Sequence, residues 1–338
     1  MRAAIFGDLH LGVRQNSEEW HTIALQWCDW FVSELKKREI GTIFFLGDFF
    51  DAKFSLSVTT LHVAAEFLSK LKDFQIHMIL GNHDLCYKSN FEVSAVTLFR
   101  GYDNIHLYST PEIVEMRGKQ LAFLGWGYNP LDYKADVLLC HAEVDMFSFN
   151  DFRKIEDGIK PSELLKRYKK VISGHIHGRQ IKSWNKGSIE YVGNPFQTKY
   201  DDSTIDKVFA IIDLDDLSME YVENDISPIF IQKKLSDIVE YPDLERFVNL
   251  LNSNFFELVL DMDITNADLN EIKRLISACN VRDAKFSFIT KQDFNVANND
   301  VKAFSIADSI MEYIDSIEVE NKGELKSYIL EIYNRYST

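Results

Sequence analysis

Short apolar runs alternate with amphipathic helical patterns over the first 220 residues of the chain. This alternation is typical of a layered α/β domain, in which helices cover a sheet. The clearest helix lies between the first two runs, where Asn16 and Glu19 form an N-capping pattern ahead of an apolar stripe that begins at Trp20. We predict strands at 3–6, 42–46, 76–80, 120–124, 136–140 and 171–173.

The pattern changes at Ile181 to short β-type runs separated by turn residues, which predicts an antiparallel sheet that completes the first domain. A second unit begins near Pro228, with strands and helices in turn up to Ile289. Two short helical patterns follow, at 303–314 and 324–336, and bury little by themselves. We therefore predict three domains, at 1–225, 226–292 and 298–338.

Five of the predicted strands end in turns that carry acidic, amide or histidine side chains. The turns read GDLH (7–10), GDFFD (47–51), GNHD (81–84), CH (140–141) and GHIH (174–177). Ligands of open α/β sheets bind beyond the carboxyl ends of the strands, so we expect these turns to meet in one crevice.

The candidate ligands in these turns are carboxylates, an amide and imidazoles, without a thiolate. They are Asp8, His10, Asp48, Asn82, His141, His175 and His177. This mixture suits two divalent metals of the manganese, iron or zinc type. In an extended chain, residues two apart point the same way, so each Asp-x-His or His-x-His pair is expected to present both side chains to one cavity.

Composition narrows the classes of function. The chain has 37 basic and 52 acidic residues, a net charge of −15, which excludes a protein that coats itself in nucleic acid by bulk electrostatics. It does not exclude a nucleic-acid enzyme whose site carries metal charge.

No apolar segment approaches the roughly 20 residues of a membrane span, so we expect a cytoplasmic protein. The four dispersed cysteines are interpreted as packing residues.

The five turns, in this order, resemble the signature of the calcineurin-like metallophosphoesterases: D-x-H, G-D-x-x-D, G-N-H-D/E, a lone H and G-H-x-H. The resemblance implies a β-sandwich flanked by helices, followed here by a small α+β capping domain and a C-terminal helical segment. It implies one metal held by Asp8, His10, Asp48 and His177. The other metal is then held by Asp48, Asn82, His141 and His175, with Asp48 as the bridge.

The same resemblance implies a catalytic role for His83, which would protonate the leaving oxygen, and for Asp51, which would orient His83. The metals it implies are Mn²⁺, with Mg²⁺ as the alternative. Glu143 receives no role, and that of Asp84 is the least defined in its turn.

Two flanking segments, GDLHLG (7–12) and YVGNPFQ (191–197), look like the SbcD-type branch, the nuclease subunits of double-strand-break repair complexes, and the short chain resembles a phage-encoded version. This implies a double-stranded DNA exonuclease and single-stranded DNA endonuclease in the host cytoplasm. Its partner would be an SbcC-type SMC-like ABC ATPase bound to the C-terminal helices. A homodimer would form through helices at 57–71 and 90–99.

Residues 164–189 contain seven basic residues and no acidic residue, and they bracket the last two histidines. One interpretation is a DNA entry beside the metals; a solvated helix face followed by a hairpin is equally compatible. Two other functions stay open: a small-molecule phosphodiesterase or phosphatase with the same centre, and a scaffold subunit that has lost catalysis. The basic residues are Lys166, Arg167, Lys169, Lys170, Arg179, Lys182 and Lys186.

Overall fold

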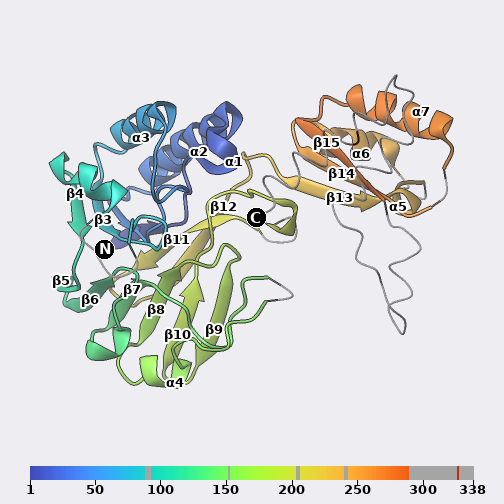
Figure 1. Cartoon of the computed structure of the whole chain (residues 1–338). Helices are drawn as coiled ribbons and strands as arrows, with labels where there is room; N and C mark the ends of the chain where they lie inside the picture. Colours follow the sequence, from blue (N-terminus) through green and yellow to red (C-terminus); the bar gives the residue numbers. More distant parts are fainter. Residues whose placement is uncertain are drawn as a thin grey trace. The chain divides into compact units, whose positions relative to one another are not determined.

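The structure is a computed structural model, and it describes residues 1–87, 93–150, 153–202, 206–239, 243–262, 264–288 and 326. A six-stranded sheet in the order β12-β11-β1-β2-β3-β4 forms one layer (Figure 1). Strands β1 to β4 are parallel, and β11 joins β1 in the antiparallel sense. The strands are β1 (Arg2–Phe6), β2 (Thr42–Phe45), β3 (Gln75–Ile79), β4 (Ile105–Tyr108), β11 (Val208–Asp213) and β12 (Met219–Glu223).

A second six-stranded sheet, in the order β5-β6-β7-β8-β10-β9, forms the other layer. Strands β6, β7, β8 and β10 are parallel, whereas β5 and β9 are antiparallel edges. The strands are β5 (Glu112–Met116), β6 (Lys119–Leu124), β7 (Val137–His141), β8 (Lys170–Gly174), β9 (Gln180–Trp184) and β10 (Gly187–Tyr191).

The two sheets pack through a shared apolar core, in which Ile5 and Phe44 of one sheet belong to the same cluster as Phe123 and Leu139 of the other. Helices α2 (Glu18–Lys37) and α3 (Val58–Lys70) cover the outer face of the first sheet (Figure 1). The predicted β-sandwich flanked by helices is thereby confirmed. The shorter helices of this region are α1 (Val13–Asn16), η1 (Ala95–Gly101), η2 (Pro130–Asp132), α4 (Pro161–Leu164) and η3 (Tyr200–Asp202).

The strands after Ile181 form the expected antiparallel pairs, β9 with β10 and β11 with β12, but they do not form one sheet. Strands β9 and β10 extend the second sheet, and β10 runs parallel to β8. Strands β11 and β12 instead extend the first sheet. The alternation of apolar residues identifies strands, but it does not determine which strand each one pairs with.

A third, three-stranded parallel sheet, in the order β13-β14-β15, has an apolar core of its own that includes Ile231, Phe256 and Leu258. Its elements alternate as predicted, and the domain boundaries stay predictions. They are β13 (Phe230–Lys234), α5 (Leu235–Val239), α6 (Leu244–Leu251), β14 (Phe255–Leu260), α7 (Asn266–Ser277) and β15 (Asp283–Phe288).

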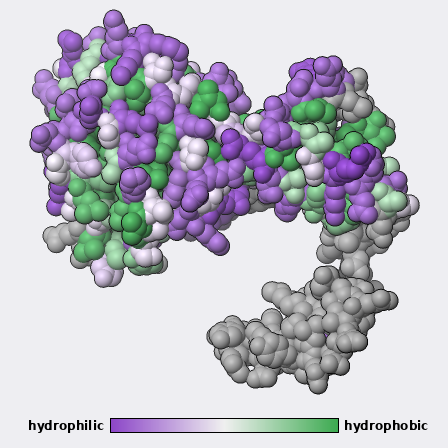
Figure 2. Space-filling model, turned by 90° about the horizontal axis from the view of Figure 1, so that it is seen from above, coloured by the Kyte–Doolittle hydropathy of each residue, from purple (hydrophilic) through white to green (hydrophobic). Residues whose placement is uncertain are grey.

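The two helical patterns predicted near the C-terminus lie outside the described residues, apart from Lys326. Within the described part of the chain, no helix is long and apolar enough to cross a membrane. The face drawn in Figure 2 is mostly hydrophilic, and its hydrophobic residues form separate patches.

Candidate metal centre

The carboxyl ends of β1, β2, β3, β7 and β8 meet at one edge of the sandwich. The backbone N–H of Asp8 donates to the carbonyl of Gly47 at 2.9 Å, which joins the first two turns. His141 Nδ1 lies 2.7 Å from the carbonyl oxygen of Leu46 and thereby ties the second sheet to the first. The predicted crevice is therefore built by contacts between turns that are distant in the sequence.

Glycine is required where two of these turns touch. Gly47 has φ +91°, and a Cβ there would lie 2.4 Å from the backbone nitrogen of Gly81. A Cβ on Gly81 would lie 2.4 Å from the backbone nitrogen of Asp48. The glycines before Asp48 and Asn82 thus let the turns after β2 and β3 come into contact.

Several candidate ligands have left-handed backbone conformations: φ is 53° for Asp8, 47° for His10, 57° for Asp48 and 89° for His175. The expectation of an extended chain at the Asp-x-His and His-x-His pairs is therefore wrong. Such conformations cost of the order of 1–3 kcal/mol each in non-glycine residues and are common at functional sites. The turns redirect these side chains after the strands have ended.

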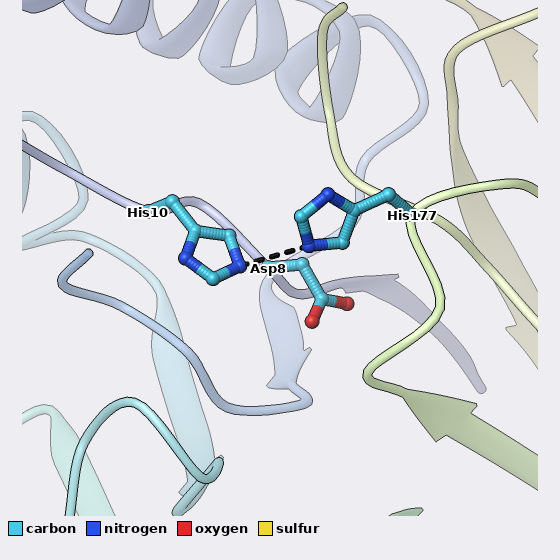
Figure 3. Close-up of side chains that lie close together, drawn as sticks. All are labelled: Asp8, His10 and His177. Atoms are coloured by element: carbon cyan, nitrogen blue, oxygen red, sulfur yellow. Dashed lines mark hydrogen bonds between the residues drawn. The ribbon is translucent and has the colours of Figure 1, made fainter. Parts of the chain in front are cut away.

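Asp8, His10 and His177 form a first group of potential ligands (Figure 3). The Nε2 atoms of His10 and His177 face each other at 3.0 Å. Neighbouring ligands at about 2.1 Å from one metal ion are themselves roughly 3.0–3.4 Å apart. The separation of the two imidazole nitrogens therefore fits a shared divalent ion.

Asp48, His141 and His175 form a second group. The side-chain oxygen of Asn82 joins it, 3.0 Å from His141 Nε2 and 2.9 Å from His175 Nδ1. Thus His175 and His177, although two residues apart, belong to different groups. This division agrees with the ligand sets that the sequence resemblance implied.

A single carboxylate oxygen lies between the two groups. Asp48 Oδ2 is 3.6 Å from His10 Nε2 and 3.4 Å from His141 Nε2. The Asp48 side chain is 3% exposed, so it is shielded from solvent on both sides. This position fits the bridging role expected of Asp48.

Burial and charge shift the pKa values of these groups in opposite directions. Burial lowers the pKa of His141, but the Asp48 and Asp8 carboxylates outweigh it and raise the value to about 9. Burial and the charge of His141 lower the pKa of His175 to about 4. Burial raises the pKa of Asp8 to about 6. Without a metal ion, His141 is therefore cationic and His175 neutral at pH 7.

His83 lies beside the first group, with its ring 4.7 Å from that of His10, and with His10 and Asp48 it forms a third group of potential ligands. Its Nδ1 is 2.6 Å from the backbone carbonyl of Asp51. The Asp51 carboxylate instead lies 3.5 Å from His10 Nδ1. Asp51 therefore contacts His83 as expected, but through its backbone carbonyl and not through its carboxylate. Burial lowers the pKa of His83.

Two residues without an expected role have clear contacts in the site. Asp84 is fully buried and accepts hydrogen bonds from the backbone N–H groups of Asp48, Phe49 and Gly81 at 2.8–2.9 Å. Burial raises its pKa to about 7. Glu143 Oε1 lies 3.0 Å from His175 Nε2. The sequence did offer a signal for both residues, since each is an acidic residue one or two positions after a histidine of the site, in GNHD and in CHAE.

The first part of the basic stretch at 164–189 lies away from the candidate ligands, whereas a DNA contact by Arg179, Lys182 and Lys186, which follow His177, stays a prediction. This first part, up to Lys170, precedes or begins β8, whereas His175 follows the other end of that strand. Lys169 and Lys170 are also paired with Asp136 and Glu190, at 2.8 and 2.9 Å. These lysines cannot supply the positive charge beside the metals that one interpretation of the sequence required.

Comparisons with known proteins agree with the geometry. The family model described as calcineurin-like phosphoesterase matches residues 1–206. Exonuclease subunit 1 of Enterobacteria phage T4 is 26% identical over 333 residues, 94% of this chain and 93% of the phage protein. The DNA double-strand break repair protein Mre11 of Methanocaldococcus jannaschii is 22% identical over 352 aligned residues, 97% of this chain and 88% of the archaeal protein.

Proposed function

Since this chain belongs to the calcineurin-like phosphoesterase family, a family of metal-dependent enzymes, we propose that it is a two-metal DNA nuclease subunit active in recombination, repair or degradation of DNA. The observation that carries the proposal is the pair of ligand groups on either side of Asp48 Oδ2, with His83 next to His10 and Asp48. DNA as the substrate is supported by the exonuclease subunit and the break-repair protein, which this chain resembles over nearly its whole length.

We assign one ion to Asp8, His10, Asp48 and His177, and the other to Asp48, Asn82, His141 and His175. Oxygen and imidazole donors without thiolate favour Mn²⁺, with Mg²⁺ as the alternative. When bound, such a pair of ions polarises a phosphodiester and lowers the pKa of water. Glu143 holds Nε2 of His175, so that Nδ1 is the nitrogen directed at the ligand group.

His83 is proposed to protonate the leaving oxygen, with Asp51 fixing its position. A carbonyl oxygen only accepts hydrogen bonds, so the hydrogen on the Nδ1 side of His83 points at the Asp51 carbonyl. Its Nε2 is then the atom that carries a proton to the substrate when the ring is protonated. Asp51 also contacts His10, which couples the acid to the first ligand group.

The decisive experiment measures cleavage of linear double-stranded DNA and of circular single-stranded DNA with Mn²⁺ or Mg²⁺. We expect manganese-dependent exonuclease and endonuclease products, and loss of both in Asp48→Asn. Asp136→Asn is a matched control, because that carboxylate pairs with Lys169 away from the ligand groups. Hydrolysis of bis(p-nitrophenyl) phosphate without DNA cleavage would favour the small-molecule phosphodiesterase or phosphatase. No hydrolysis of either substrate would favour a scaffold subunit.

We also propose that an SbcC-type SMC-like ABC ATPase binds residues 298–338, as the order of the predicted domains suggests. Truncation after residue 300 is then expected to abolish co-purification with the ATPase and to leave the basal nuclease activity intact. Co-purification of the truncated chain would place the docking site elsewhere. The phage and DNA-repair relatives support action on DNA in the host cytoplasm.

A further inference from the structure

A cavity of about 400 Å³ lies directly beside the candidate metal centre. Its wall includes His141, a member of the second ligand group, together with Trp126, Tyr128, Glu143 and Asp157. This volume falls in the range of roughly 300–1,000 Å³ that is common for small-molecule sites. Trp126 carries no metal-binding atom, and the Tyr128 hydroxyl donates to the carbonyl of Ser109, so the cavity extends the site beyond its ligands.

Backbone and ring contacts fix Trp126 next to the centre. The backbone N–H of Trp126 donates to the carbonyl of Leu80, immediately before the GNHD turn, at 2.7 Å. Its indole ring lies 4.8 Å from the His175 ring at an angle of 36°, and 5.9 Å from the His141 ring. The indole is only partly buried and lines the cavity, so part of its aromatic surface is open to a ligand.

Away from His141, part of the cavity wall is acidic. Glu143 and Asp157 are both acidic, and Glu143, 40% exposed, contacts His175 through one carboxylate oxygen. Such a wall repels an anion and favours a neutral group that donates N–H hydrogen bonds. Tyr128, whose hydroxyl donates to the carbonyl of Ser109 at 3.1 Å, adds a fixed aromatic side.

We propose that this Trp126 pocket, formed by Trp126, Tyr128, Glu143 and Asp157, receives the nucleobase next to the phosphodiester at the metal centre. The base stacks on the indole, and the amino group of adenine or cytosine donates to the carboxylates. This inference rests on the proposed DNA nuclease function. It adds a base-recognition site to the metal centre.

The test uses single-stranded oligonucleotides in which one abasic residue moves along the strand, and it measures the cleavage rate at each phosphate. For the wild type we expect cleavage at the phosphate on one side of the abasic residue to fall about tenfold, within the range for loss of one base–aromatic stack. Thymine in place of cytosine at that position should lower the rate about threefold, because it lacks the amino group.

Trp126→Leu should be about tenfold slower at all phosphates and indifferent to the abasic residue, whereas Trp126→Phe should keep most of the wild-type pattern. Trp184→Leu is the matched control, because Trp184 is a partly buried tryptophan that does not line the pocket. Metal content is measured for each variant, since Trp126 also contacts His175.

The outcomes separate this inference from the proposed function. DNA cleavage that is unaffected by the abasic residue in the wild type would overturn the base site and leave the nuclease intact. An abasic effect that persists in Trp126→Leu would also overturn the base site. So would a Trp126→Leu protein whose slower cleavage is fully explained by loss of bound metal. Hydrolysis of bis(p-nitrophenyl) phosphate without cleavage of DNA would overturn both proposals.

Discussion

The His83 imidazole is held through Nδ1 by the Asp51 carbonyl at 2.6 Å, which leaves Nε2 for the substrate. We predict that His83→Asn lowers DNA cleavage by about 10²–10³-fold, the usual contribution of a positioned general acid. Hydrolysis of bis(p-nitrophenyl) phosphate should fall less than tenfold, because nitrophenolate leaves without a proton. Steady-state rates on both substrates, with metal content measured alongside, check this. Equal losses on the two substrates would contradict the role as acid.

Two assigned ligands, His141 and His10, have raised pKa values and make metal binding depend on pH; for His10, the carboxylates of Asp51, Asp48 and Asp8 outweigh the lowering by burial. Although burial lowers the pKa of His141, Asp48 and Asp8 raise it to about 9, so the metal-free protein carries a proton on His141 at pH 7.5. A histidine must be neutral to bind a metal ion, so binding to His141 releases this proton. We predict that the apparent metal affinity rises up to about tenfold per pH unit between pH 7 and pH 9.

Calorimetry of metal binding in two buffers with different ionisation enthalpies measures the released proton directly. Burial lowers the pKa values of His175 and His177, so these residues are already neutral and add no proton in this range. Heats of binding that do not depend on the buffer would contradict the prediction.

At the scale of elements, one buried carboxylate joins two turns of the first sheet. Asp84 accepts from the backbone N–H groups of Asp48 and Phe49 after β2, and from that of Gly81 after β3. In Asp84→Asn, an amide N–H₂ replaces one carboxylate oxygen. At least one of the buried backbone N–H groups then has no acceptor. We predict a loss of about 2 kcal/mol in the free energy of unfolding and weaker metal binding.

Denaturant unfolding of the metal-free protein and a metal titration measure these two effects. Asp136→Asn serves as control, since its carboxylate accepts one backbone N–H at a partly exposed position. An Asp84→Asn protein with wild-type stability and metal affinity would show that the turns hold together without this carboxylate.

At the scale of the molecule, exposed apolar side chains on and before α3 favour the homodimer that the family resemblance implies. Val58 is 83% exposed and Leu61, one turn later, is 37% exposed, while Phe54 just before the helix is 79% exposed. The other predicted dimer helix starts within residues that the structure does not describe, and its described part is η1. Contiguous exposed apolar surface commonly marks an interface between proteins.

We predict that Val58→Glu combined with Leu61→Glu converts a dimer into a monomer, as measured by light scattering after gel filtration. The charges would be buried without partners in the interface. Leu275→Glu, on the exposed face of α7, is the control and should leave the mass unchanged. A wild-type protein that is already monomeric, or a double variant that stays dimeric, would contradict this interface.

Local pattern was sufficient to predict most strands and the helix α2, because side-chain periodicity is a property of neighbouring residues. The turn residues at strand ends selected the seven candidate ligands, whose role stays a prediction. The tertiary structure decided what depends on residues distant in the chain. It divided β9–β10 and β11–β12 between two sheets, and it directed His175 and His177 to different ligand groups.

The contacts of Asp84, Glu143 and Trp126 also belong to the tertiary structure. Each acts through partners that lie on another strand or turn: the backbone of Asp48 for Asp84, and the ring of His175 for the other two. Side-chain chemistry predicted that metals could bind at these strand ends. Only the packing of one sheet on the other determined which of these side chains lie close enough to share an ion.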